Sequence, residues 1–250
     1  SVTGPAGEAG EGAQKVGVAI ADIMAGMYAT TAILAALHAR DESGRGQTID
    51  VPLYDSQVAW LANQNMNYLV GKKVPQRMGT AHPNLVPYQA FAASDGSFML
   101  AVGNDRQFAA CAESIGRPQL ARDRRFARNQ DRIANRKELT GLLDTAFRKK
   151  TRSHWLSELR CRDVPAGPIN DIGQVFDSPY AQERHLAREL GNSNGQIVPS
   201  VANPVDFSYT PVRYDRAPPL LGEHTAEVLQ EWLGYPDEVI RELREVSAIA

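Results

Sequence analysis

Cysteine and histidine are scarce in this chain, and neither forms a pattern that binds metal. The 250 residues include two cysteines, Cys111 and Cys161, and five histidines, none of them at the spacings of metal ligands. Two cysteines so far apart in sequence favour a reduced, cytoplasmic compartment. We therefore expect a cytoplasmic protein without a metal site.

Signatures of nucleotide binding are missing as well. The chain has no G-x-G-x-x-G and no P-loop pattern, and the glycines of "SGRGQ" at 43–47 fit a turn between a helix and a strand. A strong excess of one charge is also absent, because the net charge is −2. We therefore expect no tightly bound cofactor, no nucleic acid and no membrane as partner, but a small molecule.

Charge is absent from one long stretch, with a single exception. Asp22 is the only charged side chain between Lys15 and Arg40. The apolar pattern predicts a helix over about 16–40 that is buried on all sides, and dilution by Gly, Ala and Thr argues against a membrane span. An ionised carboxylate removed from water without a partner costs several kcal/mol, so Asp22 has either a structural partner or a chemical task.

The neighbours of Asp22 favour a chemical task. Ala21, Ala25 and Gly26 are small, so they leave space for a ligand or another backbone to approach the carboxylate. A desolvated carboxylate with room above it is a candidate nucleophile. The structural alternative is a carboxylate near a helix start that is compensated by the helix dipole.

The rest of the chain reads as mixed α and β structure. After a flexible Gly-rich start, we expect a strand at 48–55, a helix at 56–70, a functional loop at 71–87 and a hairpin at 88–104. A helix capped by Asn104 and Gln107 and stopped by Gly116 follows. The last predicted elements are two Arg-rich helices at 131–149 and 153–161 in a solvated layer, a turn at 164–171, a short helix opened by Ser178, two or three strands within 195–214, and two C-terminal helices that separate at Gly234.

Several long motifs in order resemble one family. "VGVAIADIMAGMYATTAILAALHARDESGRGQTIDVPLYD", "QRMGTAHPNLVPYQAFAASDG", "VPAGPINDIGQVFDSP" and "PPLLGEHTAEVLQEWLGY" look like class III (formyl-CoA/carnitine-type) CoA-transferases, in particular the succinate–glutarate branch. The resemblance covers essentially the whole chain. It implies an α/β fold in an interlocked homodimer, with a Rossmann-like large domain formed by 1–70 and 201–250 and a smaller α+β domain formed by 71–200.

The resemblance also implies a reaction and the residues that carry it. Asp22 occupies the position of the family's nucleophile, which passes through aspartyl anhydride and aspartyl-CoA thioester intermediates, with coenzyme A as a co-substrate. Gly79 and His82 in the loop are expected to contact the acyl group, and His82 or Arg77 to pair with the free carboxylate of a dicarboxylic acid. The chain begins at Ser1, where the N-terminal part of the family's large domain should be complete, so a separate segment or chain is expected to supply most CoA contacts.

Two alternatives remain at this stage. In the α-methylacyl-CoA racemase branch, which has "GAIEPQF" where this chain has "GNDRQF", the equivalent aspartate is an acid/base and Asp105 would replace a glutamate. In the other alternative, the protein is a non-catalytic relative in which Asp22 only fixes helix packing.

Overall fold

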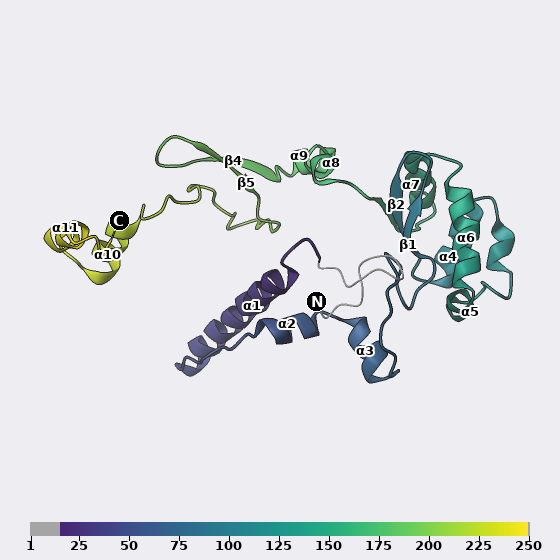
Figure 1. Cartoon of the computed structure of the whole chain (residues 1–250), viewed down its shortest axis with the longest axis horizontal. Helices are drawn as coiled ribbons and strands as arrows, with labels where there is room; N and C mark the ends of the chain where they lie inside the picture. The colour runs from purple at the N-terminus through teal and green to yellow at the C-terminus, as the bar shows by residue number, and fades with distance from the viewer. Residues whose placement is uncertain (1–15, 250) are drawn as a thin grey trace. The chain divides into compact units, whose positions relative to one another are not determined.

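A computed structural model of the chain describes residues 16–249 (Figure 1). The flexible start predicted before residue 16 lies outside the described residues. The chain divides into two units, residues 1–169 and residues 170–250, which we describe separately. The domain limits predicted at residues 70 and 200 remain a prediction.

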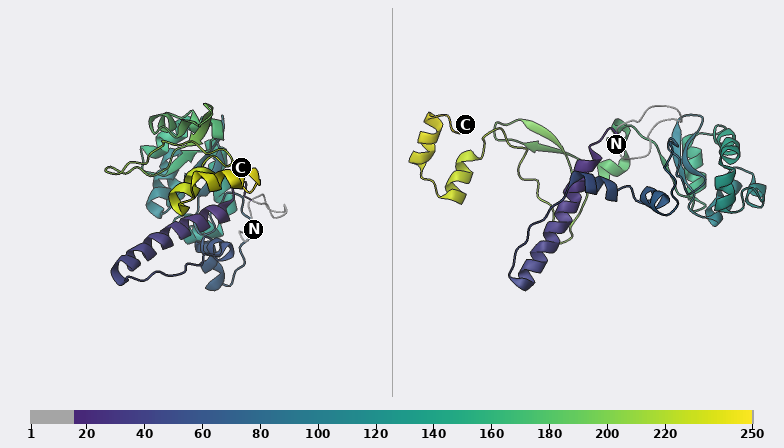
Figure 2. Two further views of the ribbon diagram at one scale, coloured as in Figure 1. Left: turned by 90° about the vertical axis from the view of Figure 1, so that its left-hand side faces the viewer. Right: turned by 60° about the horizontal axis from the view of Figure 1, so that its bottom comes forward.

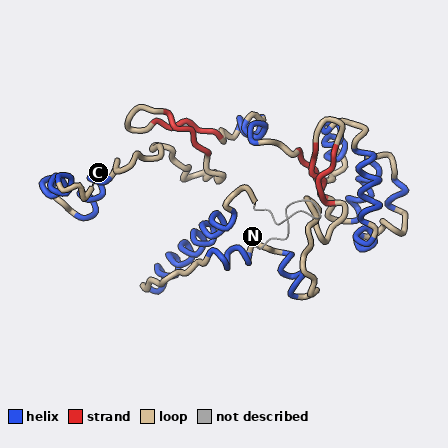
Figure 3. Tube along the Cα trace, in the orientation of Figure 1, coloured by secondary structure: helices blue, strands red, loops and turns tan. Residues whose placement is uncertain are grey.

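Unit 1 contains a three-stranded antiparallel sheet and most of the helices (Figure 3). Strand β2 lies in the middle, with Met99 opposite Ala90 of β1 on one side and opposite Gly167 of β3 on the other. The elements are α1 (Ile20–Ser43), α2 (Leu53–Ala59), α3 (Asn63–Leu69), β1 (Tyr88–Ala92), β2 (Ser97–Ala101), α4 (Asp105–Ser114), the 3₁₀ helix η1 (Pro118–Ala121), α5 (Asn129–Ala134), α6 (Arg136–Phe147), α7 (Arg152–Arg160) and β3 (Ala166–Pro168).

The core of unit 1 lies between this sheet and helices α4, α6 and α7. Phe147 of α6 is its centre, because the rings of Phe91, Phe98 and Trp155 all lie within 5.1–5.2 Å of the Phe147 ring, measured between centroids. The Trp155 indole N–H also donates to the Phe147 carbonyl at 2.6 Å, so the burial of this polar group is compensated. The buried residues of this core all lie between Val86 and Val164.

Local signals in this part of the sequence predicted the elements well. Asn104 Oδ1 accepts the Gln107 amide at 2.9 Å, and Gln107 Oε1 accepts the Gly103 amide at 2.8 Å, so the predicted cap of α4 is confirmed. The helix ends before Gly116, whose φ of 71° lies in the left-handed region that favours glycine. Strand β3 was not predicted, because its three residues lie in the proline-marked segment that we expected to be a turn.

Helix α1 forms where predicted but is not buried as predicted. Of its residues only Ala25 is buried, whereas Ile23 and Leu34 are 52% and 63% exposed. Helix α2 packs beside α1 (Figure 2) but covers only part of its surface. By length and composition alone, α1 could also cross a membrane. These two properties are weak evidence of a membrane span, because buried helices of soluble proteins share them.

Two predictions between α1 and the long loop are wrong. No strand forms at 48–55: residues 45–52 have no regular structure and helix α2 starts at Leu53, because within residues 16–249 no neighbouring strand pairs with this segment. The helix predicted over 56–70 is divided in two, since Ala62 has a φ of 49°, which a continuous α-helix does not allow. The loop predicted at 71–87 is confirmed.

Unit 2 consists of a β-hairpin and two helix pairs. Strands β4 and β5 are antiparallel, and the prediction of two or three strands within 195–214 is wrong, because only β5 lies in this range and its partner β4 precedes it. Gly234, with a φ of 67°, separates the two last helices as predicted. The elements are α8 (Ile172–Phe176), α9 (Pro179–Glu183), β4 (Ala187–Gly191), β5 (Ile197–Val201), α10 (Thr225–Leu233) and α11 (Asp237–Glu245).

Candidate active site

Asp22 lies in the first turn of α1 and is exposed. The N-terminal end of a helix carries a partial positive charge that stabilises a carboxylate, and Ala19 at the N-cap supplies no side-chain hydrogen bond of its own. Within residues 16–249 no side chain pairs with the Asp22 carboxylate. The desolvation that we expected from the sequence is therefore not found in the described chain, where Asp22 is exposed and α2 covers only part of α1.

One face of α1 next to Asp22 is open in the described chain. Gly26, one helical turn further on, has no atom within 4 Å of the place where a Cβ would lie. A larger group can therefore approach this face of α1 next to the carboxylate. Farther along the same helix, apolar residues such as Ile33 and Leu34 are exposed.

The loop at 71–87 contains the other predicted site residues in two different settings. Gly79 is exposed with a φ of 58°, a conformation that few other residues adopt, and Arg77 is half-buried. His82, in contrast, belongs to a densely hydrogen-bonded segment. Among the described residues no hydrogen bond or ion pair joins Asp22 to this loop, so the predicted roles of Gly79, Arg77 and His82 remain predictions.

His82 is held by its backbone and by its ring. Its amide donates to the Tyr88 carbonyl at 2.8 Å, and its ring stacks on the Tyr88 ring with centroids 5.2 Å apart. The Asn84 amide donates to His82 Nδ1 at 3.1 Å, so this nitrogen carries no proton and the ring is the neutral Nε2–H form. Burial, and then the positive charge of Arg136, lower the pKa of His82 from its ordinary value of 6.5, in agreement with a neutral ring.

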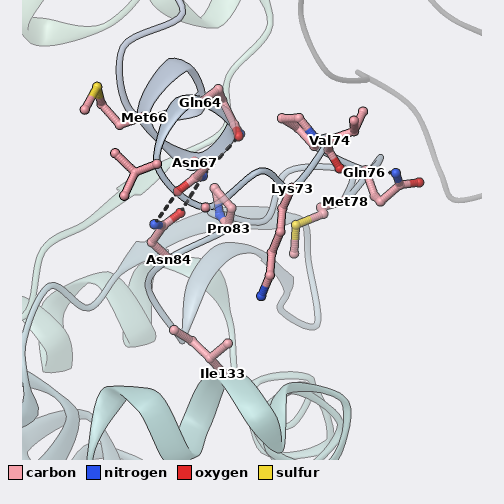
Figure 4. Close-up of a pocket in the computed structure, with 13 residues that line it drawn as sticks. Gln64, Met66, Asn67, Lys73, Val74, Gln76, Met78, Pro83, Asn84 and Ile133 are labelled. Atoms are coloured by element: carbon pink, nitrogen blue, oxygen red, sulfur yellow. Dashed lines mark hydrogen bonds between the residues drawn. The ribbon is translucent and has the colours of Figure 1, made fainter.

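A pocket of about 630 Å³ lies between α3 and this loop (Figure 4). Asn67 and Asn84 bridge its two walls through a reciprocal pair of amide hydrogen bonds, 3.0 and 2.9 Å long. The predicted substrate residues do not line it. The lining residues are Gln64, Met66, Asn67, Val70, Gly71, Lys73, Val74, Pro75, Gln76, Met78, Pro83, Asn84 and Ile133.

Sequence reasoning missed the residues that organise this region. Arg132, from a helix that we expected to be solvated, is only 1% exposed, and its Nη2 donates to Asp105 Oδ1 at 2.7 Å. Asn129 and Arg136, together with Arg132, bond the backbone of the loop. An arginine-rich helix gives no sequence signal that tells the buried arginine from its exposed neighbours.

Asp105, the candidate acid of the racemase alternative, has a structural partner. Its carboxylate compensates the buried Arg132 guanidinium, which also lies over the Phe108 ring at 4.4 Å. The aspartate in "GNDRQF" therefore has a local explanation that needs no acid/base chemistry.

Comparison with known proteins gives a consistent result. The sequence profile of CoA-transferase family III matches residues 1–225. The succinate–glutarate CoA-transferase of Agrobacterium fabrum is 45% identical over 87% of this chain and 54% of its own length. The human succinyl-CoA:glutarate CoA-transferase is 39% identical over 93% of this chain and 53% of its own length.

A solved structure shows the same fold. A CaiB/BaiF family protein from Brucella suis superimposes with a TM-score of 0.72 at 43% identity, over 92% of this chain and 60% of that protein. The mixed α and β class predicted from the sequence is confirmed, although the sheets within residues 16–249 are antiparallel. The chain spans about half the length of the curated relatives that it matches. With 225 residues matched by the profile, the chain belongs to CoA-transferase family III.

Proposed function

We propose that the protein transfers coenzyme A from an acyl-CoA to a carboxylic acid, with Asp22 as the nucleophile. The observation that carries the proposal is the location of Asp22. It is the only charged residue of α1 before Arg40, it lies at the positive end of that helix next to small side chains, and the helix belongs to a segment that matches the family profile.

The reaction proceeds by two exchanges at the Asp22 carboxylate. The carboxylate attacks the thioester carbonyl, the C–S bond breaks, and a mixed anhydride and the CoA thiolate result. The thiolate attacks the aspartyl carbonyl and releases the donor acid, which leaves Asp22 as a CoA thioester. The acceptor carboxylate attacks this thioester to give a second anhydride, from which the thiolate takes the acyl group and regenerates Asp22. No water, metal or redox step is required.

We propose succinyl-CoA as donor and a dicarboxylic acid such as glutarate as acceptor, since the relatives with 45% and 39% identity are named for these acids. The proposed partner is a second copy of the protein, because a second copy could pack against the exposed apolar residues of α1. The proposed compartment is the cytoplasm. A further segment or chain that corresponds to the other half of the relatives' length would provide most CoA contacts.

Substitution of Asp22 tests the proposal. Asp22→Asn keeps the shape of the side chain but removes the nucleophile, so we expect the rate of CoA exchange between succinyl-CoA and glutarate to fall by roughly 10⁴-fold or more. Asp41→Asn is the matched control, because Asp41 lies exposed on the same helix and should leave the rate unchanged. Circular dichroism must show both variants folded.

Each outcome separates the alternatives. Full activity of folded Asp22→Asn would contradict a nucleophilic role. Loss of folding in Asp22→Asn, with no acyl-CoA chemistry in the wild-type protein, would support the packing role of a non-catalytic relative. Exchange of the α-hydrogen of a branched acyl-CoA, without CoA transfer, would support the racemase reading.

A further inference from the structure

The segment from His82 to Val86 is held from one side by a helical surface far away in sequence. Asn129 bonds it twice: Nδ2 donates to the Asn84 carbonyl at 2.8 Å, and Oδ1 accepts the Val86 amide at 3.2 Å. Arg132 Nε donates to the Val86 carbonyl at 2.6 Å. These bonds satisfy backbone groups that have no strand or helix partners.

Arg136 holds the other end of the segment. Its Nη2 donates to the carbonyls of His82 and Pro83, at 2.9 and 3.0 Å. Asn129, Arg132 and Arg136 follow one another at spacings of three and four residues, along α5 and the start of α6. We call these three residues the backbone clamp.

The backbone clamp has a rigid base. Besides its bond to the loop, the buried Arg132 donates through Nη1 to the Phe126 carbonyl at 2.9 Å, and its guanidinium is held between Asp105 and the Phe108 ring. A buried guanidinium with all these partners has little freedom to move. The segment that it holds is therefore fixed to the core of unit 1, whereas no clamp residue bonds the part of the loop before His82.

This arrangement fixes the orientation of the His82 ring. Arg136 of the backbone clamp holds the Pro83–Asn84 peptide through the Pro83 carbonyl, the N–H of the same peptide bonds His82 Nδ1, and the Tyr88 ring supports the face of the imidazole. Within residues 16–249 no group accepts a hydrogen bond from Nε2. The ring therefore offers one neutral N–H donor in a fixed orientation, which is suited to a carbonyl or carboxylate oxygen.

We propose that the backbone clamp of Asn129, Arg132 and Arg136 is the positioning device that presents His82 Nε2–H to an oxygen of the carboxylic acid substrate. This inference rests on the proposed function, and it adds that the recognition group is a neutral donor that the small α+β module orients. His82 would contact the substrate, whereas the three clamp residues act only through the loop.

Arg136 variants of the full-length protein test the inference, because Arg136 lies at the rim of the core. Arg136→Met removes both hydrogen bonds to the loop, whereas Arg136→Lys keeps the positive charge and an ammonium group that can donate. Lys137→Met removes an adjacent exposed charge and is the matched control. Three readouts are needed: hydrogen exchange of the peptide at 82–86, the KM for glutarate against kcat, and the CoA adduct formed on Asp22 from succinyl-CoA alone.

Arg136→Met should speed hydrogen exchange at 82–86 and raise the KM for glutarate by about tenfold each, as expected from the loss of charge-assisted hydrogen bonds. The CoA adduct on Asp22 should still form in Arg136→Met. Arg136→Lys should show smaller increases in the exchange rate and in the KM, and Lys137→Met should match the wild type in both. Unchanged exchange would show that Arg136 does not hold the loop, and faster exchange with an unchanged KM would show that the clamp is only structural. Either result overturns the inference, whereas a wild-type protein without an Asp22 adduct overturns the proposed function instead.

Discussion

Single residues were predicted unevenly from the sequence. Asp22 could be singled out because its charge interrupts an apolar run, a contrast that is visible without a structure. His82 could be placed in a loop, but its neutral state depends on the Asn84 amide and on Arg136, which is 54 residues away. Contacts of that kind have no local signal, so the sequence could suggest an ion pair with a carboxylate but not a neutral donor.

The neutral state of His82 predicts how stability depends on pH. Because the folded-state pKa of His82 lies below its ordinary value of 6.5, the unfolded chain binds a proton more readily than the folded chain. The contribution of His82 to stability is therefore complete above pH 6.5 and is lost as the pH falls through and below this value. His82→Gln, which keeps an acceptor for the Asn84 amide, should lose less stability on acidification than the wild type.

Urea unfolding at pH 7.5 and pH 5.5 measures this difference. We expect the gap between the urea midpoints of wild type and His82→Gln to shift in favour of the variant at the lower pH. An equal difference between the two urea midpoints at pH 7.5 and pH 5.5 would show that His82 takes up a proton in the folded state as readily as in the unfolded state.

At the scale of elements, the predictions depended on whether the signal was local. The cap at Asn104, the stop at Gly116 and the hairpin predicted at 88–104 are encoded by local patterns and were confirmed. The strand at 48–55 was wrong because a strand depends on a partner that the local pattern does not supply. The solvated layer at 131–149 was wrong in part, because Leu139, Leu143 and Phe147 form one buried face of α6.

The buried Arg132 gives a prediction about the stability of these elements. Arg132→Met keeps much of the side-chain volume but leaves the buried carbonyls of Val86 and Phe126 without their donors. At about 1–3 kcal/mol for each unsatisfied group, the free energy of unfolding should fall by about 3 kcal/mol. Urea unfolding followed by far-UV circular dichroism measures the change.

Asp105→Asn is the control for this variant. The Asp105 side chain is 55% exposed and asparagine keeps a hydrogen-bond acceptor for Arg132, so Asp105→Asn should lower the free energy of unfolding by less than Arg132→Met does. Equal effects of the two substitutions would mean that the ion pair, and not the hydrogen bonds to the carbonyls, fixes Arg132 in the core.

At the scale of the whole molecule, the chain is a member of CoA-transferase family III that spans about half the length of its curated relatives. The family could be predicted from the sequence because several long motifs occur in order. The burial of α1 could not be predicted from the apolar pattern alone, because Ile23 and Leu34 are exposed within residues 16–249. The same holds for Asp22, whose expected desolvation requires that α1 be covered.

If Asp22 carries the CoA group during transfer, a mass spectrum of the proteolytic peptide that contains Asp22 shows the group on that residue. After incubation of the full-length protein with succinyl-CoA and no acceptor, we predict a CoA adduct on Asp22 that hydroxylamine removes and that is absent from Asp22→Asn. An unmodified Asp22 peptide, or an adduct on another residue while CoA transfer proceeds, would contradict the role of Asp22 as the CoA carrier.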